Sequence, residues 1–238
     1  MKDTTITGSS GCAPALGYHD LPRLIALMTG DEKHAASADS TLDVLWVLYD
    51  RVLNVTQATV DDPDRDRFLL SKGHGPMSYY ATLAAKGFIP IETLPTFRSY
   101  DSPLGGHPDR MLIPGVEISS GSLGHGLPIS VGLALGLRAQ GRQSRVVVLV
   151  GDAELDEGSN HEAVALAGRM GLDRLTVVVV DNRSATYGWP GGIASRFEIE
   201  GWASATVDGR NHDALAAALT AEHLGQPKLV IAMVEKGA

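Results

Sequence analysis

Short apolar runs alternate along the chain with segments whose apolar residues recur at helical spacing. The runs predict buried strands over 67–70, 116–119, 146–150, 175–180 and 229–234. The helical spacing predicts helices over 21–28, 41–55, 76–86, 127–139 and 157–170. Strands that are apolar throughout and alternate with helices favour a parallel sheet that is covered on both sides. We therefore predict an α/β fold: a doubly wound, mostly parallel sheet with helices on both faces.

The two ends of the chain differ in composition from its interior. Residues 1–20 are rich in Thr, Ser and Gly, and we expect them to form a flexible tail. Residues 98–115 hold many Gly, Pro and Asp, which predicts a long loop. We expect residues 21–238 to fold as one domain, because a chain of this length is sufficient for one α/β core.

Charge and cysteine content narrow the class of protein. The formal net charge of −8 argues against nucleic acid and anionic membranes as main partners, since both are bound through a surplus of Lys and Arg. The single cysteine, Cys12, has no partner for an internal disulfide, so a reducing cytoplasm is the expected location. The first residues lack the apolar core of a signal peptide, and the apolar runs are too short to span a bilayer.

Polar residues follow two of the predicted strands directly. Gly151-Asp152 ends one strand, and Asp181-Asn182 ends the next strand along the chain. Ligands of parallel sheets bind at the carboxyl ends of the strands. Carboxylate and amide oxygens suit Mg²⁺, which commonly bridges protein oxygens to the phosphates of a ligand. The pattern predicts a site for magnesium and a diphosphate.

Each of these residues also has a simpler interpretation. An Asp at a strand end is often a helix cap, and an Asn after a strand is often only a turn former. The longer pattern is more specific, because Glu157-Gly158 follows Asp152 before the second strand. In this form it resembles the thiamine diphosphate signature of transketolases.

The resemblance to transketolases extends over most of residues 21–236. Several further blocks follow one another in the family order: Ser71-Lys72-Gly73-His74-Gly75, Gly106-His107-Pro108, Pro114-Gly115-Val116-Glu117, Gly121-Ser122-Leu123-Gly124 and Val207-Asp208-Gly209. This many ordered blocks make a coincidence improbable. The resemblance implies the thiamine-diphosphate-binding fold, and specifically the domain that holds the diphosphate.

The resemblance also implies roles for individual residues. Magnesium, for which Ca²⁺ or Mn²⁺ could substitute, would be held by Asp152, Asn182 and the backbone oxygen of Ser184. The residues implied to contact thiamine diphosphate are His74, Gly121, Ser122, Leu123, Gly151, Asp152, Ala153, Glu154, Asn182 and Thr186. The residues implied to act in catalysis are His34, His74, His107 and Glu157, the last of which would link two cofactor sites across a dimer. We interpret His161, His212 and His223 as surface residues and place His19 in the tail.

The sequence departs from the family pattern in places that matter for chemistry. Ala153 stands where the family has a second Gly beside the diphosphate. Lys33-His34-Ala35-Ala36 replaces the usual Gly-His-Pro-Gly, and Ser122 replaces a usual Pro. The resemblance therefore leaves the substrate open.

A pyrimidine-binding domain, which in transketolases carries the glutamate that activates the cofactor, does not fit within these 238 residues. The resemblance thus implies that the partner is a separate C-terminal transketolase subunit, in an α2β2 heterotetramer. It also implies transfer of a two-carbon ketol unit from a ketose to an aldehyde. Two alternatives stay open. One is another thiamine diphosphate carboligase or acyl transferase of a specialised pathway. The other is a non-catalytic paralogue that acts as an assembly partner.

Overall fold

The computed structural model describes residues 16–31, 34–185 and 189–234 of the chain. Five parallel strands form one sheet in the order β1-β2-β3-β5-β4. The strands are Arg67–Leu70 (β1), Val146–Gly151 (β2), Leu175–Asp181 (β3), Ala203–Asp208 (β4) and Lys228–Met233 (β5). The register of β2 and β3 pairs Gly151 with Val180, so that both strands end at the same edge of the sheet.

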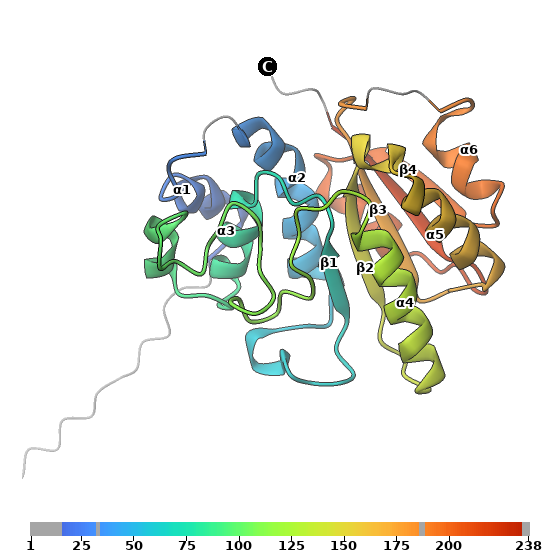
Figure 1. Ribbon diagram of the computed structural model, residues 1–238, viewed down its shortest axis with the longest axis horizontal. Helices are drawn as coiled ribbons and strands as arrows, with labels where there is room; N and C mark the ends of the chain where they lie inside the picture. Colours follow the sequence, from blue (N-terminus) through green and yellow to red (C-terminus); the bar gives the residue numbers. More distant parts are fainter. Residues whose placement is uncertain (1–15, 32–33, 186–188, 235–238) are drawn as a thin grey trace, which may run out of the picture.

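Seven α-helices in the described residues cover the two faces of this sheet (Figure 1). They are Leu21–Ile25 (α1), Ala35–Val47 (α2), Met77–Ala85 (α3), Gly126–Ala139 (α4), Gly158–Arg169 (α5), Gly192–Glu198 (α6) and His212–Thr220 (α7). Shorter helical turns are Tyr18–Asp20, Leu48–Val52, Gln57–Thr59, Ile91–Thr96 and Ala153–Asp156. Figure 1 shows α4, α5 and α6 on one side of the sheet and α1, α2 and α3 on the other.

The central strand β2 shows why the sheet is buried on both faces. Val147 and Leu149 pack with the core beneath α1, α2, α3 and α7. Val146, Val148 and Val150 pack with the core beneath α4, α5 and α6. Because successive side chains point to opposite faces, a continuous apolar run fills both cores at once. The predicted α/β fold with a parallel sheet and helices on both faces is confirmed.

Two predictions about strands are wrong. Residues 116–119 form no strand, because Ser120 donates its backbone N–H to the Pro108 carbonyl, 3.0 Å away, and its hydroxyl to the Leu70 carbonyl, 2.6 Å away. The segment therefore passes the edge of β1 without a ladder of backbone bonds. In addition, the sequence pattern did not reveal β4, an edge strand whose side chains are mostly half-exposed. An edge strand of this kind lacks the apolar run that marked the others.

The first helix begins at Leu21 as predicted but ends at Ile25, and the second begins six residues earlier than predicted. Helix α2 starts at Ala35, with His34 at its N-cap, and a π-helical turn over Leu48–Val52 ends it. Of the tail predicted over residues 1–20, the structure describes 16–20, and these residues pack against the domain. The Tyr18 ring lies 6.2 Å from the ring of Trp46 in α2.

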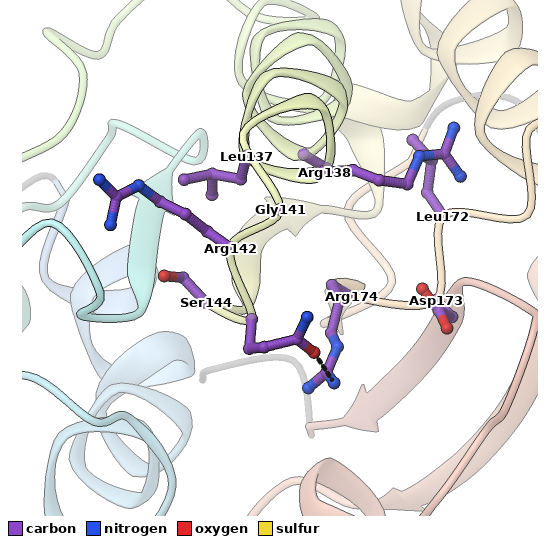
Figure 2. A pocket seen from close by; sticks show the side chains of 10 residues that line it. Leu137, Arg138, Gly141, Arg142, Ser144, Leu172, Asp173 and Arg174 are labelled. Atoms are coloured by element: carbon purple, nitrogen blue, oxygen red, sulfur yellow. Dashed lines mark hydrogen bonds between the residues drawn. The ribbon is translucent and has the colours of Figure 1, made fainter.

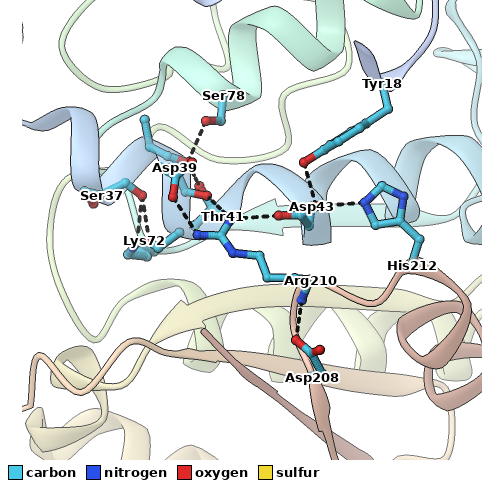
Figure 3. A network of polar contacts seen from close by, with 12 residues as sticks. Tyr18, Ser37, Asp39, Thr41, Asp43, Lys72, Ser78, Asp208, Arg210 and His212 are labelled. Atoms are coloured by element: carbon cyan, nitrogen blue, oxygen red, sulfur yellow. Dashed lines mark hydrogen bonds and ion pairs between the residues drawn. The ribbon is translucent and has the colours of Figure 1, made fainter. Parts of the chain in front are cut away.

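A buried carboxylate ties the beginning of the chain to helices α2 and α7 (Figure 3). Asp43 accepts hydrogen bonds from the Tyr18 hydroxyl at 2.6 Å and from Arg210 Nη1 at 2.8 Å, and its Oδ1 lies 2.8 Å from His212 Nε2. We call these four residues the Asp43 cluster. His212, predicted to be a surface residue, is largely enclosed here, with a side chain 19% exposed. The cluster stabilises the packing of three segments that are distant in sequence.

Candidate functional site

The polar motifs meet at the carboxyl edge of the sheet. Ser71 and Lys72 follow β1, Asp152 follows β2, and Asn182 follows β3. These three strands are neighbours in the sheet, so their ends lie side by side. The predicted placement of the motifs at this edge agrees with the structure, whereas the role of each residue stays a prediction.

Asp152 is held rigidly beneath the turn that follows β3. Its side chain accepts three hydrogen bonds, from Ser184 N and Ser184 Oγ at 2.6 Å each and from Ala185 N at 3.0 Å. The residue is only 3% exposed. The same turn contains the Ser184 backbone oxygen that was predicted as a metal ligand.

Asn182 offers an acceptor that the described protein leaves unused. Its Oδ1 is buried and has no hydrogen-bond partner among the described residues. A buried polar oxygen normally has a partner, because losing water without replacement costs about 1–3 kcal/mol. A hard cation beside Asp152 would supply that partner, so this oxygen fits the predicted role.

The types of donor atom at this edge indicate which metal ions could bind there. Within the described residues, no three His, Cys, Asp or Glu side chains converge as a metal centre. A cation at this edge would therefore depend on the mixed set of one carboxylate, one amide oxygen and one backbone carbonyl. Oxygen donors of this kind suit Mg²⁺ or Ca²⁺, whereas zinc prefers His and Cys.

Glu154 organises the backbone of the site from below. Its buried carboxylate accepts hydrogen bonds from the Ser71 hydroxyl, from Gly124 N at 3.0 Å and from Gly151 N at 3.4 Å. Burial raises the pKa of Glu154, although these three bonds oppose the shift. The carboxylate thus connects three protein segments, and the predicted contact of Glu154 with the cofactor stays a prediction.

Two glycines allow the loops to pack closely around His107. A side chain at Gly73 would place its Cβ 2.9 Å from Gly121 N, and a Cβ at Gly121 would lie 3.2 Å from the His107 ring. Gly121 also has a φ of +128°, which residues with a side chain rarely adopt. These positions therefore require glycine, and they let the loops after β1 and before α4 approach each other closely.

Three histidines form a row in this region. The ring centroids of His34 and His74 are 5.3 Å apart, as are those of His74 and His107. Burial lowers the pKa of His107, and the neighbouring His74 and His34 lower it further. All three were predicted as catalytic from separate motifs, and the fold brings them together.

Lys72 is a residue of this site for which the sequence analysis proposed no role. Its ammonium group donates to the Ser37 carbonyl at 3.0 Å and to Ser40 Oγ at 2.7 Å. Burial lowers the pKa of Lys72 to about 8, against the attraction of Asp152 and the neighbouring Glu154. Its position inside the Ser71-Lys72-Gly73-His74 block, directly after a strand, was the available signal.

The other predicted residues surround the same edge. Gly151 is the last residue of β2, and Ala153 begins the helical turn after Asp152. Ser122 and Leu123 are exposed in the loop before α4, and Glu157 is exposed at the N-cap of α5. Thr186 lies outside the described residues.

A separate pocket of about 200 Å³ lies at the opposite, amino edge of the sheet (Figure 2). It is lined by Arg138, Arg142 and Arg174 around Leu137 and Leu172. None of the predicted site residues lines it.

None of the helices in the described residues is both long and apolar enough to cross a membrane.

Comparison with known families gives one match over most of the chain. Residues 26–235 match the family described as "Transketolase, thiamine diphosphate binding domain". The match includes all three strand ends of the site. It agrees with the family that the sequence motifs predicted.

Curated relatives include proteins that are named as single subunits. One is named as a subunit of the apulose-4-phosphate transketolase of Actinobacillus succinogenes, and it is 38% identical over 86% of this chain and 77% of that protein. Another is "6-deoxy-6-sulfo-D-fructose transketolase subunit SqwG" of a Clostridium species, 32% identical over 86% of this chain and 77% of that protein. A protein named "Ferredoxin fas2" from Rhodococcoides fascians is 58% identical over 92% of this chain and 72% of that protein.

Solved structures give the same answer for the fold. The transketolase of Leishmania mexicana superposes with a TM-score of 0.71 at 27% identity, over 87% of this chain. The transketolase of Campylobacter jejuni superposes with a TM-score of 0.74 at 25% identity, over 92% of this chain. The matched region is 37% and 38% of those two chains, so the present sequence spans little more than a third of each.

Proposed function

This chain belongs to the transketolase family, and on that premise we propose that it is the diphosphate-binding subunit of a split, thiamine-diphosphate-dependent transketolase. The observation that carries the proposal is the convergence of Asp152, Asn182 and the histidine row at one sheet edge. The reaction is transfer of a two-carbon ketol unit from a ketose donor to an aldehyde acceptor.

Gly151 and Ala153 would hold the cofactor diphosphate at the ends of β1 and β2: Ala153 through its backbone N–H, and Gly151, whose own N–H donates to Glu154, by allowing close approach to the backbone. Asp152 and Asn182, with the Ser184 backbone oxygen, would hold Mg²⁺, which would offset the negative charge of the diphosphate. The unused acceptor of Asn182 supports this assignment. The methyl group of Ala153 leaves the N–H available for an anion, so its replacement of Gly is compatible with binding.

The bound cofactor supplies an electron sink for breaking the carbon–carbon bond next to a ketone. His107 would orient the donor sugar through hydrogen bonds to its hydroxyl groups, and His74 would contact the diphosphate. His107 acts as a neutral acceptor near neutral pH, because burial and its histidine neighbours lower its pKa. His34, at the far end of the row, contacts the substrate rather than the cofactor.

A second, separately encoded protein completes the active site. It contributes the pyrimidine-binding domain and the glutamate that activates the cofactor. Support comes from the relatives named as single subunits and from exposed apolar side chains, which are Leu123 in the loop before α4, Ile129 on α4 and Leu166 on α5. Exposed apolar residues grouped on one face are typical of protein interfaces. We further propose an α2β2 assembly, a cytoplasmic location, and a domain over 21–238 that follows a tail.

The substrates named for the relatives guide the choice of test compounds. Their names specify a sugar phosphate in one case and a sulfonated sugar in the other. We propose an anionic ketose as donor for this chain as well. The name ferredoxin of a third relative does not extend to this sequence, because one cysteine cannot supply the four thiolates of a typical iron–sulfur cluster.

Titration calorimetry tests the proposal directly. The chain is titrated with thiamine diphosphate and Mg²⁺, alone and mixed with a candidate C-terminal transketolase subunit from the same organism. We expect binding that requires Mg²⁺ and becomes tighter with the partner. The mixture is then assayed for ketol transfer with phosphorylated and unphosphorylated ketoses.

The outcomes separate the competing functions. Cofactor binding with transfer activity supports a transketolase subunit. Cofactor binding with decarboxylation of a 2-oxo acid instead would indicate another carboligase or acyl transferase. Complex formation with the partner but no cofactor binding would overturn the enzymatic proposal and leave an assembly role.

A further inference from the structure

His34 differs from the other histidines of the row because a buried carboxylate holds its ring. Its Nδ1 lies 2.8 Å from Oδ1 of Asp31. The Asp31 side chain is only 2% exposed, whereas that of His34 is 31% exposed. The backbone supports the same contact, because His34 N donates to the Asp31 carbonyl at 2.9 Å. The ring is thus attached to the protein on one side and open on the other.

The carboxylate is in turn held by Arg98. Its Nη1 donates to the same Asp31 oxygen at 2.8 Å and to the Gly30 carbonyl at 2.9 Å. Arg98 has a φ of +60°, in the left-handed region that a residue with a side chain adopts at a cost in free energy. Its N–H donates to the Leu104 carbonyl at 2.8 Å, which fixes the backbone in this conformation.

These contacts determine which nitrogen of His34 carries the proton. A carboxylate paired with a guanidinium only accepts hydrogen bonds. The nitrogen that contacts it, Nδ1, must therefore be the donor, and Nε2 is left as the nitrogen available to a substrate. The neutral ring would otherwise be free to take either form.

We propose that Asp31 and Arg98 are positioning residues that fix the orientation and the Nδ1-protonated form of His34, so that Nε2 acts on the substrate. We call Asp31, His34 and Arg98 the His34 cluster. The proposal deepens the function given above and rests on it for the role of Nε2. It also explains how His34 is held where the usual Gly-His-Pro-Gly is replaced by Lys33-His34-Ala35-Ala36.

The first test needs neither cofactor nor substrate. Long-range ¹H–¹⁵N correlation spectra of the full chain at about pH 8.5, above the ordinary imidazole pKa, report which ring nitrogen carries the proton. We expect the Nδ1-protonated signature for His34, and a shift towards the Nε2-protonated form in Asp31→Asn. An Nε2-protonated His34 in the wild type, or no change in the variant, would overturn the proposal.

The second test measures catalysis in the assembled complex. Asp31→Asn should lower kcat by about 10–100-fold, the usual scale for a residue that orients a functional ligand, while the affinity for thiamine diphosphate stays unchanged. An unchanged kcat in a variant whose His34 spectrum has shifted would also overturn the proposal. Should the spectra agree with the proposal while the wild-type complex transfers no ketol unit, the fault lies with the proposed function.

Two further variants control for folding. Asp20→Asn alters a different carboxylate beside a histidine, since His19 Nε2 lies 3.4 Å from Asp20 Oδ2, and should leave both the His34 spectrum and kcat unchanged. Arg98→Gly removes the guanidinium and accepts the positive φ without strain. It should change the His34 spectrum and kcat in the same direction as Asp31→Asn. If a folded Arg98→Gly protein retained both wild-type values, Arg98 would have no positioning role.

Discussion

The His34 cluster and the Asp43 cluster both contain an aspartate, a histidine and an arginine, but their surroundings differ. In each, an aspartate carboxylate lies 2.8 Å from a histidine nitrogen and 2.8 Å from an arginine nitrogen. In the Asp43 cluster, Tyr18 closes the open side. Its hydroxyl donates to Asp43, and its ring meets the His212 ring edge to face, with centroids 4.5 Å apart.

Among the described residues, no aromatic side chain covers the His34 cluster as Tyr18 covers the Asp43 cluster. The neighbouring ring is that of another histidine, His74. The His34 ring lies 5.3 Å from that of His74, at the carboxyl edge of the sheet. The same three residue types therefore stabilise tertiary packing in one place and leave a ring nitrogen available in the other. Surroundings, rather than residue identity, separate a structural cluster from a functional one.

The largest effect is expected on the functional side of this comparison. Asp152→Ala removes the carboxylate of the proposed magnesium site and should reduce ketol transfer by about 1,000-fold or more, since a bound metal contributes several kcal/mol. Calorimetry should show loss of Mg²⁺-dependent cofactor binding. A control Asp64→Ala variant, which removes an exposed carboxylate paired with Arg142, should retain binding. Retained activity in Asp152→Ala would show that the metal assignment is wrong.

The second-largest effect is expected in the Asp43 cluster, on the free energy of unfolding. Asp43→Asn should lower the free energy of unfolding by about 2–3 kcal/mol, because Arg210 and His212 lose a charged, buried acceptor. Urea denaturation measures this loss. Cofactor affinity should stay close to wild type. A large loss of cofactor binding without loss of stability would contradict the division between the two clusters.

A smaller effect, on the affinity for thiamine diphosphate, is expected at Lys72, which belongs to neither cluster. It is half-buried, and its side chain runs beside Gly151, one of the proposed diphosphate residues. Lys72→Met should weaken binding of thiamine diphosphate by about tenfold, because it removes a cation near the diphosphate. Calorimetry provides the affinity, and Lys86→Met, which removes a surface cation, is the control. Equal affinities of the two variants would exclude this role for Lys72.

The smallest effect concerns acid stability. Burial alone would raise the pKa of Asp43, but hydrogen bonds from Tyr18, Arg210 and His212 outweigh it and lower the pKa below its usual value. Asp43 therefore stabilises the fold above the pKa of an unfolded Asp, about 3.9, and this contribution is lost as the pH falls further. Between about pH 5 and about pH 3, the free energy of unfolding should therefore fall less steeply in Asp43→Asn than in the wild type. Parallel slopes would contradict the assignment.

Much of the site could be predicted because its residues stand in local motifs. Asp152, Asn182 and His74 follow apolar runs directly, so the strand ends placed them at one edge. Asp31 and Arg98 could not be predicted in this way. They are 67 residues apart, and only the fold brings Arg98 Nη1 within 2.8 Å of Asp31. The same reason explains why His212 was mistaken for a surface residue.

The sequence by itself determined the parallel sheet, the family and the placement of the predicted cofactor residues at one sheet edge, because continuous apolar runs and short motifs act over a few neighbouring residues. The tertiary structure decided the rest: the edge strand β4, the hydrogen bonds of Glu154 to the Ser71 hydroxyl and two backbone N–H groups, and the partners of His34 and His212. These features depend on contacts between residues far apart in the chain. Burial and hydrogen bonding at such contacts determine the role of a side chain, and a local sequence motif does not reveal these contacts.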